Sequence, residues 1–270
     1  MSESRVAMTI DPENWEVLLA AVFLVINAGL SLALNLGFVR QMTVAALRMV
    51  VQMALIGLVL KVILTTKSPG LTALVATVML AVAGYEVMAR QERRLKGIWG
   101  YGLGAATMLL GASLVMLFAL NVTIRPDPWY DPRYAIPLFG MMLGNAMTGI
   151  AIGLNALAND LASRRAAVEA HLLTGATRWQ ALAPSMRRAA RAGLIPIINA
   201  MAATGVVSLP GMMTGQILAG ADPEQAVRYQ ILVMFLIAGA TGIGLVVALW
   251  GAAWRLSDRR HRIRLDRLTG

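Results

Sequence analysis

The chain has 270 residues, of which 58% are hydrophobic and only 14% are charged, and its mean hydropathy is +0.66. Soluble domains hold about 45–50% apolar and about 25% charged residues, so this composition excludes an ordinary soluble domain. The net charge of +10 then indicates arginine-rich cytoplasmic loops of a membrane protein rather than binding to nucleic acid. The absence of cysteine excludes disulfides and thiolate metal sites.

Apolar runs of about 20 residues recur along the chain, and each is long enough for a helix to cross a hydrocarbon core of about 30 Å. They predict an all-α, polytopic transmembrane protein that forms a single permease domain over residues 1–270. The start of the chain lacks the pattern of a cleaved signal peptide, so the first run is expected to stay as a helix. The predicted spans are 15–36, 44–64, 70–89, 99–123, 135–157, 194–219 and 229–254.

Arginine is concentrated in the loops 90–96 and 158–193 and in the tail 255–270. The loops at 124–134 and 220–228 are nearly neutral. The positive-inside rule therefore predicts that the basic segments are cytoplasmic, and seven spans then leave the N-terminus outside. In the outer loop at 124–134, Asp127 and Asp131 allow either a carboxylate cation site or a solvated, proline-stiffened interfacial loop.

Arg48 and Glu86 each lie about one turn inside a predicted span, at similar depth near the cytoplasmic surface. Ionisable groups in hydrocarbon are costly and usually pair or face an aqueous cavity. We predict that Arg48 and Glu86 approach each other or share a polar cluster with Gln52. The alternative is that each side chain reaches the interface separately.

The fifth and sixth predicted spans contain the two G-x-x-x-G motifs GMMLG (140–144) and GMMTG (211–215), which favour close helix packing. Pro210 inside an apolar run predicts a kink whose freed carbonyl can line a cavity. The paired methionines are either soft thioether ligands or flexible core fillers. A translocation pathway is therefore expected to use polar, thioether and carbonyl groups of these two spans, from Met141, Met142, Asn145, Asn199, Thr204, Ser208, Pro210, Met212, Met213 and Gln216.

The stretch EAHLLTGATRWQALAP (169–184) interrupts the apolar runs with a helix–glycine–helix pattern. Gly175 is expected to end one helix in a left-handed conformation. Thr177 and Gln180 have the spacing of a capping box that starts the next helix, which Pro184 ends or extends into another. An amphipathic helix on anionic lipid and a simple connecting loop are both possible, but a cytoplasmic partner with a cleft for a short rigid helix accounts for all these features.

The residue pairs Glu169-Ala170, Gly175-Ala176 and Trp179-Gln180 resemble the EAA loop of ABC-transporter permeases, although His171 stands where that pattern has a second alanine. The stretches 144–157 and 207–237 resemble the FetB family, the membrane subunit of a bacterial iron-export ABC transporter. The resemblance implies a homodimer in the bacterial inner membrane that exports iron or a related metal cation. It also implies coupling to an ABC ATPase subunit through Glu169, Ala170, Gly175, Thr177, Trp179, Gln180 and Leu182.

No phosphate-binding loop is expected in this chain, because that loop ends in Gly-Lys-Ser/Thr and none of Lys61, Lys67 and Lys96 follows a glycine. We therefore expect a transport subunit that is not an enzyme and holds no cofactor, with ATP and Mg²⁺ bound by the partner ATPase.

The cargo is less defined, because a bare ferrous ion prefers carboxylate or imidazole ligands. The spans offer Glu16 and Glu86 and no histidine. The cation could pass along amide, carbonyl and thioether groups or leave as a complex. Three alternatives remain: an ABC permease for an organic anion or lipid, an ion-gradient-driven secondary transporter, and a membrane scaffold.

Overall fold

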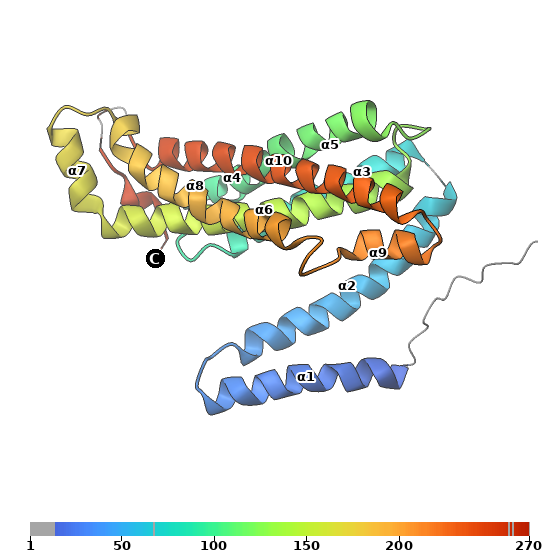
Figure 1. Ribbon diagram of the computed structural model, residues 1–270. Coiled ribbons are helices and arrows are strands. Elements are labelled where there is room, and N and C mark those ends of the chain that lie inside the picture. The colour runs from blue at the N-terminus through green and yellow to red at the C-terminus, as the bar shows by residue number, and fades with distance from the viewer. Residues whose placement is uncertain (1–13, 67, 259, 261, 270) are drawn as a thin grey trace, which may run out of the picture. The chain divides into compact units, whose positions relative to one another are not determined.

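The computed structural model describes residues 14–66, 68–258, 260 and 262–269, and the regular elements in this part of the chain are helices (Figure 1). Six of these helices are long and apolar enough to cross a membrane, so the chain is a polytopic helical membrane protein, as predicted. The chain forms two compact units. Of the described residues, the first unit holds those from 14 to 66 with 218–220, and the second holds the others.

The first unit is a helical hairpin of α1 (Asn14–Ala33) and α2 (Val39–Thr66). Asn35 and Gly37 adopt positive φ angles of 50° and 74° and reverse the chain between the two helices. Most apolar side chains of this hairpin are exposed, as expected for helices that face hydrocarbon.

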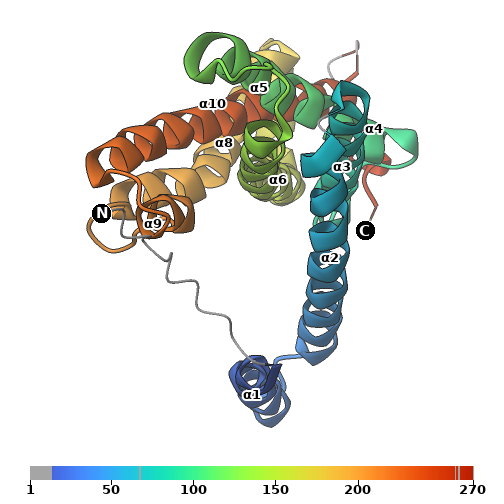
Figure 2. The same cartoon turned by 90° about the vertical axis from the view of Figure 1, so that its right-hand side faces the viewer.

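The second unit is built around α6 (Pro132–Ser163). Viewed along the helices, α6 lies between α3 (Pro69–Ala89) on one side and α8 (Arg178–Ala203) with α10 (Pro223–Arg255) on the other (Figure 2). At about 1.5 Å per residue, the 32 residues of α6 extend about 48 Å. Many side chains of α6 are buried in the hydrophobic core, and Met142 is among those that are fully buried. Helix α6 is therefore the centre of this core.

The predicted span 99–123 is one continuous helical segment over residues 98–124. It consists of α4 (Ile98–Met108), the π-helical turn η1 (Leu109–Ser113), α5 (Leu114–Phe118) and a second π-helical turn, η2 (Ala119–Ile124). The loop that follows leads directly into α6. There, the buried Asp131 caps the helix by accepting a hydrogen bond of 2.9 Å from the Arg133 N–H. This carboxylate therefore has a structural role in the loop.

The sixth predicted span, 194–219, is wrong as a single helix. The helix α8 starts much earlier and continues through Pro184 and Pro196 to Ala203, so the expectation that Pro184 interrupts it is also wrong. The chain is non-helical over 204–210, with Gly205 at a φ of 87°, and resumes as α9 (Gly211–Leu218). Pro210 therefore precedes a helix, where its missing N–H costs nothing, instead of kinking one.

Glycines set the closest helix crossings of the second unit. A Cβ added at Gly149 of α6 would lie 2.7 Å from the Gly193 carbonyl oxygen of α8, and one at Gly193 would lie 2.6 Å from the Gly149 oxygen. Gly104 of α4 approaches the Gly84 carbonyl of α3 in the same way. These contacts confirm close packing at several small-residue positions. The motif 211–215 differs, because a Cβ at Gly211 or Gly215 meets no described atom within 4 Å. In the motif 140–144, a Cβ at Gly140 would lie 3.2 Å from the Met79 methyl group of α3, whereas one at Gly144 meets no described atom within 4 Å.

Replacing Gly149 with alanine is expected to destabilise the protein by about 1–3 kcal/mol, since the new methyl group must displace backbone of α8. Thermal unfolding of the purified chain in detergent measures the effect. The matched control is Gly144→Ala in the same helix. A methyl group at Gly144 meets no described atom, and alanine favours helix more than glycine does, so an unchanged or slightly raised Tm is expected. Equal destabilisation by both changes would contradict the crossing described above.

Candidate functional site

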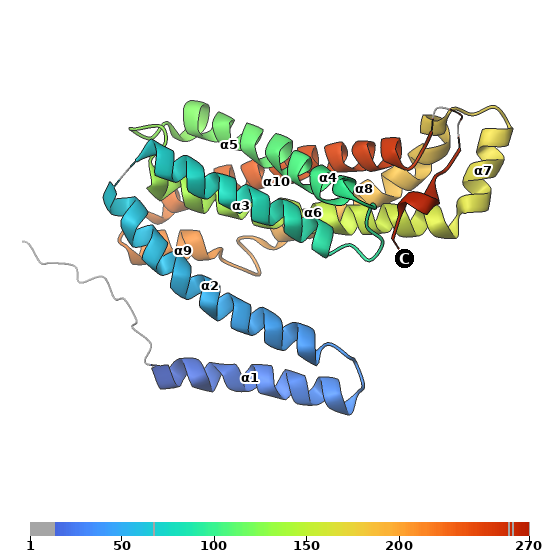
Figure 3. The same ribbon diagram turned by 180° about the vertical axis from the view of Figure 1, so that it is seen from behind.

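The basic segments of the second unit meet at one end, which we call the basic end. It comprises loop 90–97, the segment 164–178 and the described residues after 255. The tail lies beside loop 90–97 (Figure 3): the Thr269 N–H donates to the Arg94 carbonyl at 2.8 Å, and the Lys96 N–H donates to the Arg267 carbonyl at 2.8 Å. Loop 90–97 and the described part of the tail therefore share one end of the second unit. The predicted loop 158–193 is in part helical, because α8 begins at Arg178, and the cytoplasmic placement of these segments stays a prediction.

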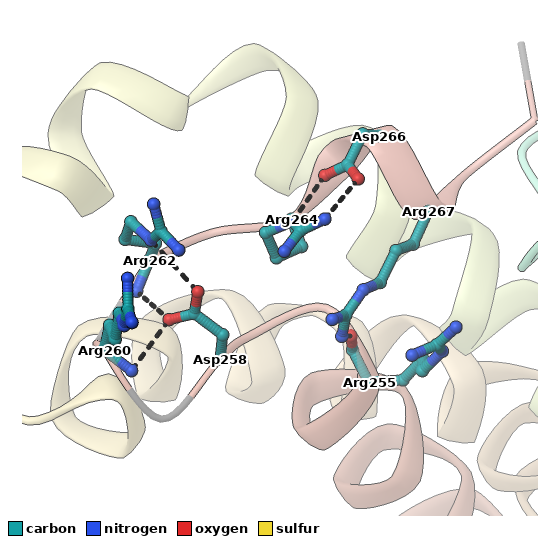
Figure 4. Close-up of polar contacts among 7 residues, drawn as sticks. All are labelled: Arg255, Asp258, Arg260, Arg262, Arg264, Asp266 and Arg267. Atoms are coloured by element: carbon teal, nitrogen blue, oxygen red, sulfur yellow. Dashed lines mark hydrogen bonds and ion pairs between the residues drawn. The ribbon is translucent and has the colours of Figure 1, made fainter.

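Two carboxylates organise the tail (Figure 4). Asp258 accepts hydrogen bonds from the backbone N–H groups of Arg260 and Arg262, both at 2.9 Å, and pairs with the Arg262 side chain. The Arg264 guanidinium donates two bonds of 2.8 Å to Asp266. The Arg262 backbone lowers the pKa of Asp258, and Arg264 lowers the pKa of Asp266 to about 2. Both carboxylates are therefore ionised at neutral pH and hold the arginines in place.

The helix–glycine–helix pattern folds as the sequence predicts. Helix α7 (Arg165–Leu173) ends in a turn in which Gly175 has a φ of 89°. The Ala176 N–H donates to the His171 carbonyl and the Gly175 N–H to the Leu172 carbonyl, at 3.2 and 3.1 Å. These paired bonds satisfy the last carbonyls of α7 in the Schellman arrangement and fix a sharp, rigid corner.

The capping box at the start of α8 is confirmed. The Gln180 N–H donates to the Thr177 hydroxyl at 3.3 Å, and the Gln180 side-chain oxygen accepts from the Thr177 N–H at 2.8 Å. One turn further, Leu182 is fully buried in the core, while Trp179 is partly buried and packs against Trp250 of α10. The start of α8 is thus held to the rest of the second unit by apolar contacts.

An ion pair that we did not anticipate from the sequence ties α6 to α8 below this corner. Arg188 donates to both oxygens of Asp160, at 3.0 and 2.7 Å, and Arg164 lies 3.3 Å from the same carboxylate. The Asp160 side chain is only 15% exposed. One turn earlier on α6, Asn155 donates to the Arg90 carbonyl and accepts from the Glu92 N–H, both at 3.0 Å. Polar residues at 155, 159 and 160 were the available signal, since they line the basic end of the fifth span.

The predicted coupling residues lie together at this corner, with different exposure. Glu169 pairs with Arg165 at 2.7 Å and lines a hollow of about 420 Å³ between α7 and the tail. Ala170 is exposed. The tip of α7 is Leu173, an apolar side chain that is 89% exposed and also lines the hollow. Leu173 therefore presents an apolar surface outside the helical bundle.

The predicted pathway residues are not joined into one site by hydrogen bonds between the described parts of α6 and residues 199–216. Met142 is fully buried in the core, whereas Asn145 and Asn199 are exposed. The Asn145 amide donates to the Met141 carbonyl of its own helix, and the Thr204 hydroxyl donates to the carbonyl of Ala200. The other predicted pathway residues, which follow α8, are exposed Ser208 and partly buried Pro210, Met212, Met213 and Gln216. Among the described residues, no three His, Asp or Glu side chains lie close enough to hold a metal ion.

The predicted polar cluster divides between the two compact units. Glu86 lies on α3 in the second unit and forms an ion pair of 3.5 Å with Arg90. Arg48 and Gln52 lie on α2 in the first unit. An approach of Arg48 to Glu86 therefore stays a prediction.

Replacing Asp160 with asparagine is expected to lower the free energy of unfolding by about 1–3 kcal/mol, because a charge-assisted, two-point contact with Arg188 is lost. Thermal unfolding in detergent measures it. For Arg188→Gln, which removes the partner, the charge-matched control is exposed Arg191→Gln, one turn along α8. Combining Asp160→Asn with Arg188→Gln is expected to cost less than the sum of the two single changes. Strict additivity would show that the two side chains do not interact.

The chain matches the Uncharacterised protein family (UPF0014) over residues 14–256. It is 40% identical to the UPF0014 membrane protein slr1647 of Synechocystis over 84% of this chain and 87% of that protein. It is 33% identical to the protein ALUMINUM SENSITIVE 3 of Arabidopsis thaliana, over 85% and 82% of the two chains. It is 31% identical to the probable iron export permease protein FetB of Escherichia coli, over 82% and 83%. No solved structure matches. Six apolar helices and a match that covers most of the chain establish that this protein belongs to the UPF0014 family of membrane proteins.

Proposed function

We propose that this chain is the permease subunit of an ABC transporter of the FetB type in the bacterial inner membrane. Two copies form one pathway that exports iron or a related metal cation, and a separate ATPase subunit supplies the energy. Similarity to a probable iron export permease supports the transport role. The basic end is then cytoplasmic, in agreement with the positive-inside rule.

The observation that carries the proposal is the rigid corner between α7 and α8. Its backbone groups are satisfied by the turn around Gly175 and by the capping box of Thr177, so its shape is fixed without help from a partner. Its tip, Leu173, is exposed to the extent that a docking surface requires. A preorganised apolar tip binds a cleft at lower entropic cost than a flexible loop.

Helix α8 gives this corner a mechanical connection to the membrane region. It is continuous from Arg178 to Ala203, about 39 Å of helix, so a force applied at the corner acts on its far end. The Asp160–Arg188 ion pair links the same movement to α6. ATP-driven closure of the partner would therefore tilt α6 and α8 together, and the non-helical residues 204–210 would absorb the change in direction.

An ABC permease for an organic anion or lipid is the second candidate. It keeps every coupling feature and needs no metal ligands, and the described residues contain no cluster of three acidic or imidazole groups. The two candidates differ in cargo alone. A secondary transporter would instead work without an ATPase subunit.

Replacing Leu173 with aspartate is expected to abolish co-purification with the ATPase subunit, because a charge at the apolar tip opposes insertion into an apolar cleft. The Tm of the permease alone is expected to stay unchanged, since the side chain is almost fully exposed. Ile98→Asp is the matched control: Ile98 is 83% exposed at the start of α4, next to loop 90–97. If Leu173→Asp retained full binding and coupled transport, the docking role of this corner would be excluded.

Ferrous ion is expected to stimulate ATP hydrolysis by the permease–ATPase complex in liposomes, with export that requires ATP. The ATPase activity is expected to rise with ferrous ion and not with calcium or magnesium, because these metal ions prefer different ligands. Stimulation by an organic anion or a lipid, with no response to metal, would support the second candidate. Transport by the permease without its partner would exclude both.

A further inference from the structure

An open groove runs between α8 and α10 near the basic end. Trp179 and Trp250 lie at its outer part, and Ala183, Ala190 and Val246 line its course toward the membrane interior. Its volume is about 290 Å³. From Trp179 to Ala190 it follows 12 residues of helix, which rise about 16 Å from the first to the last.

The groove combines apolar walls with a cationic rim. The two indole rings pack with centroids 4.8 Å apart, and Trp250 is 55% exposed. Arg178 lies over the Trp179 ring at 5.1 Å, and Arg187 lines the groove itself. Trp250 is five residues from Arg255, the last residue of α10, so the pair lies at the depth of a membrane interface, where tryptophan is enriched.

Arg187 differs from several arginines at or near the basic end. Arg165, Arg188, Arg262 and Arg264 are each paired with a carboxylate. Within the part of the chain that the structure describes, the exposed Arg187 side chain forms no ion pair. A cation beside an apolar groove at the interface calls for an anion that also carries a long apolar chain.

We infer that this groove is a binding site for an anionic phospholipid, with an acyl chain between α8 and α10 and the phosphate against Arg187 and Arg178. Arginine binds phosphate oxygens through directed, charge-assisted hydrogen bonds. Basic pockets between transmembrane helices are suited to such head groups. The inference does not depend on the proposed transport function.

A second copy of the chain fits the groove less well than a lipid does. In a two-fold dimer about the membrane normal, the same surface faces itself at the same depth. With the groove on the two-fold axis, Arg187 of one protomer would approach Arg187 of its partner, and like charges at close range are unfavourable. A lipid phosphate supplies the opposite charge.

An occupied groove would stabilise the corner between α7 and α8. The lipid would contact Trp179, which is the second residue of α8 and follows the capping residue Thr177. The acyl chain would also cover the exposed face of Trp250. Membrane composition would thereby affect the rigidity of this corner.

The test uses the full chain, delipidated in detergent, and native mass spectrometry with phosphatidylglycerol or phosphatidylcholine carrying identical acyl chains. The expected preference for phosphatidylglycerol is about five- to tenfold, in line with one or two arginine contacts. Arg187→Gln is expected to remove most of this preference, and Ala183→Leu, which fills the groove, to reduce binding of both lipids. The controls are Arg93→Gln at the same end and Ala202→Leu on an exposed part of α8; both are expected to bind like the unmodified chain.

Three results would overturn the inference. Equal binding of the two lipids would mean that the arginines do not select a head group. An equal loss in Arg93→Gln and Arg187→Gln would show diffuse attraction to the basic end instead of a site. Because the chain has no cysteine, Val246→Cys introduces a single thiol; efficient crosslinking between two copies in membranes would assign the groove to a protein interface.

Discussion

The structure of the second unit depends on the close approach of α6 and α8 at Gly149 and Gly193. Each glycine places its missing side chain against the carbonyl oxygen of the other, at distances that no methyl group tolerates. In a membrane the hydrophobic effect does not drive helices together, so association depends on this kind of backbone proximity and on polar contacts. The crossing brings the two antiparallel helices α6 and α8 close enough for Asp160 to meet Arg188 further along. The two helices are thereby held side by side over this length. The corner at their ends is therefore held to the bundle and does not move independently of it.

The corner between α7 and α8 is stabilised by four interactions, two local and two between helices. The turn at Gly175 and the capping box at Thr177 act within six residues and satisfy backbone groups. The Trp179–Trp250 contact and the Asp160–Arg188 pair act between helices. The local interactions set the shape of the corner, and the long-range ones set its position on the bundle. Under the proposed function, a partner that pushes on Leu173 would therefore meet a rigid element, and a lipid in the α8–α10 groove would add to the interactions between helices.

The difference between local interactions and interactions between helices also explains which features the sequence predicted. The left-handed Gly175, the capping box and the spans other than 194–219 were predictable because each depends on residues within one helix or one turn. The Asp160–Arg188 pair was not, because its members are 28 positions apart and meet only through the α6–α8 crossing. Pro184 was expected to break a helix, yet α8 continues, since burial of its neighbours Ala181 and Ser185 outweighs one lost hydrogen bond. The predicted sixth span includes Gly205, because the small and apolar residues around it give a high local hydropathy. Hydropathy carries no information on the positive φ that ends the helix there.

The exposed side-chain amides of α6 and α8, Asn145 and Asn199, indicate which surface a transport pathway would use. A side-chain amide facing hydrocarbon is costly even when, as for Asn145, it bonds to its own helix. Its neighbour Gly144 is open, with no described atom near the position of a Cβ. A small residue beside an amide on one helix face is the usual composition of a helix–helix contact in a membrane. The face of α6 that carries Asn145 therefore calls for a covering surface from outside the second unit. This is the arrangement that a pathway shared between two copies of the chain would provide, with its polar groups at the contact and the buried Met142 behind them in the core.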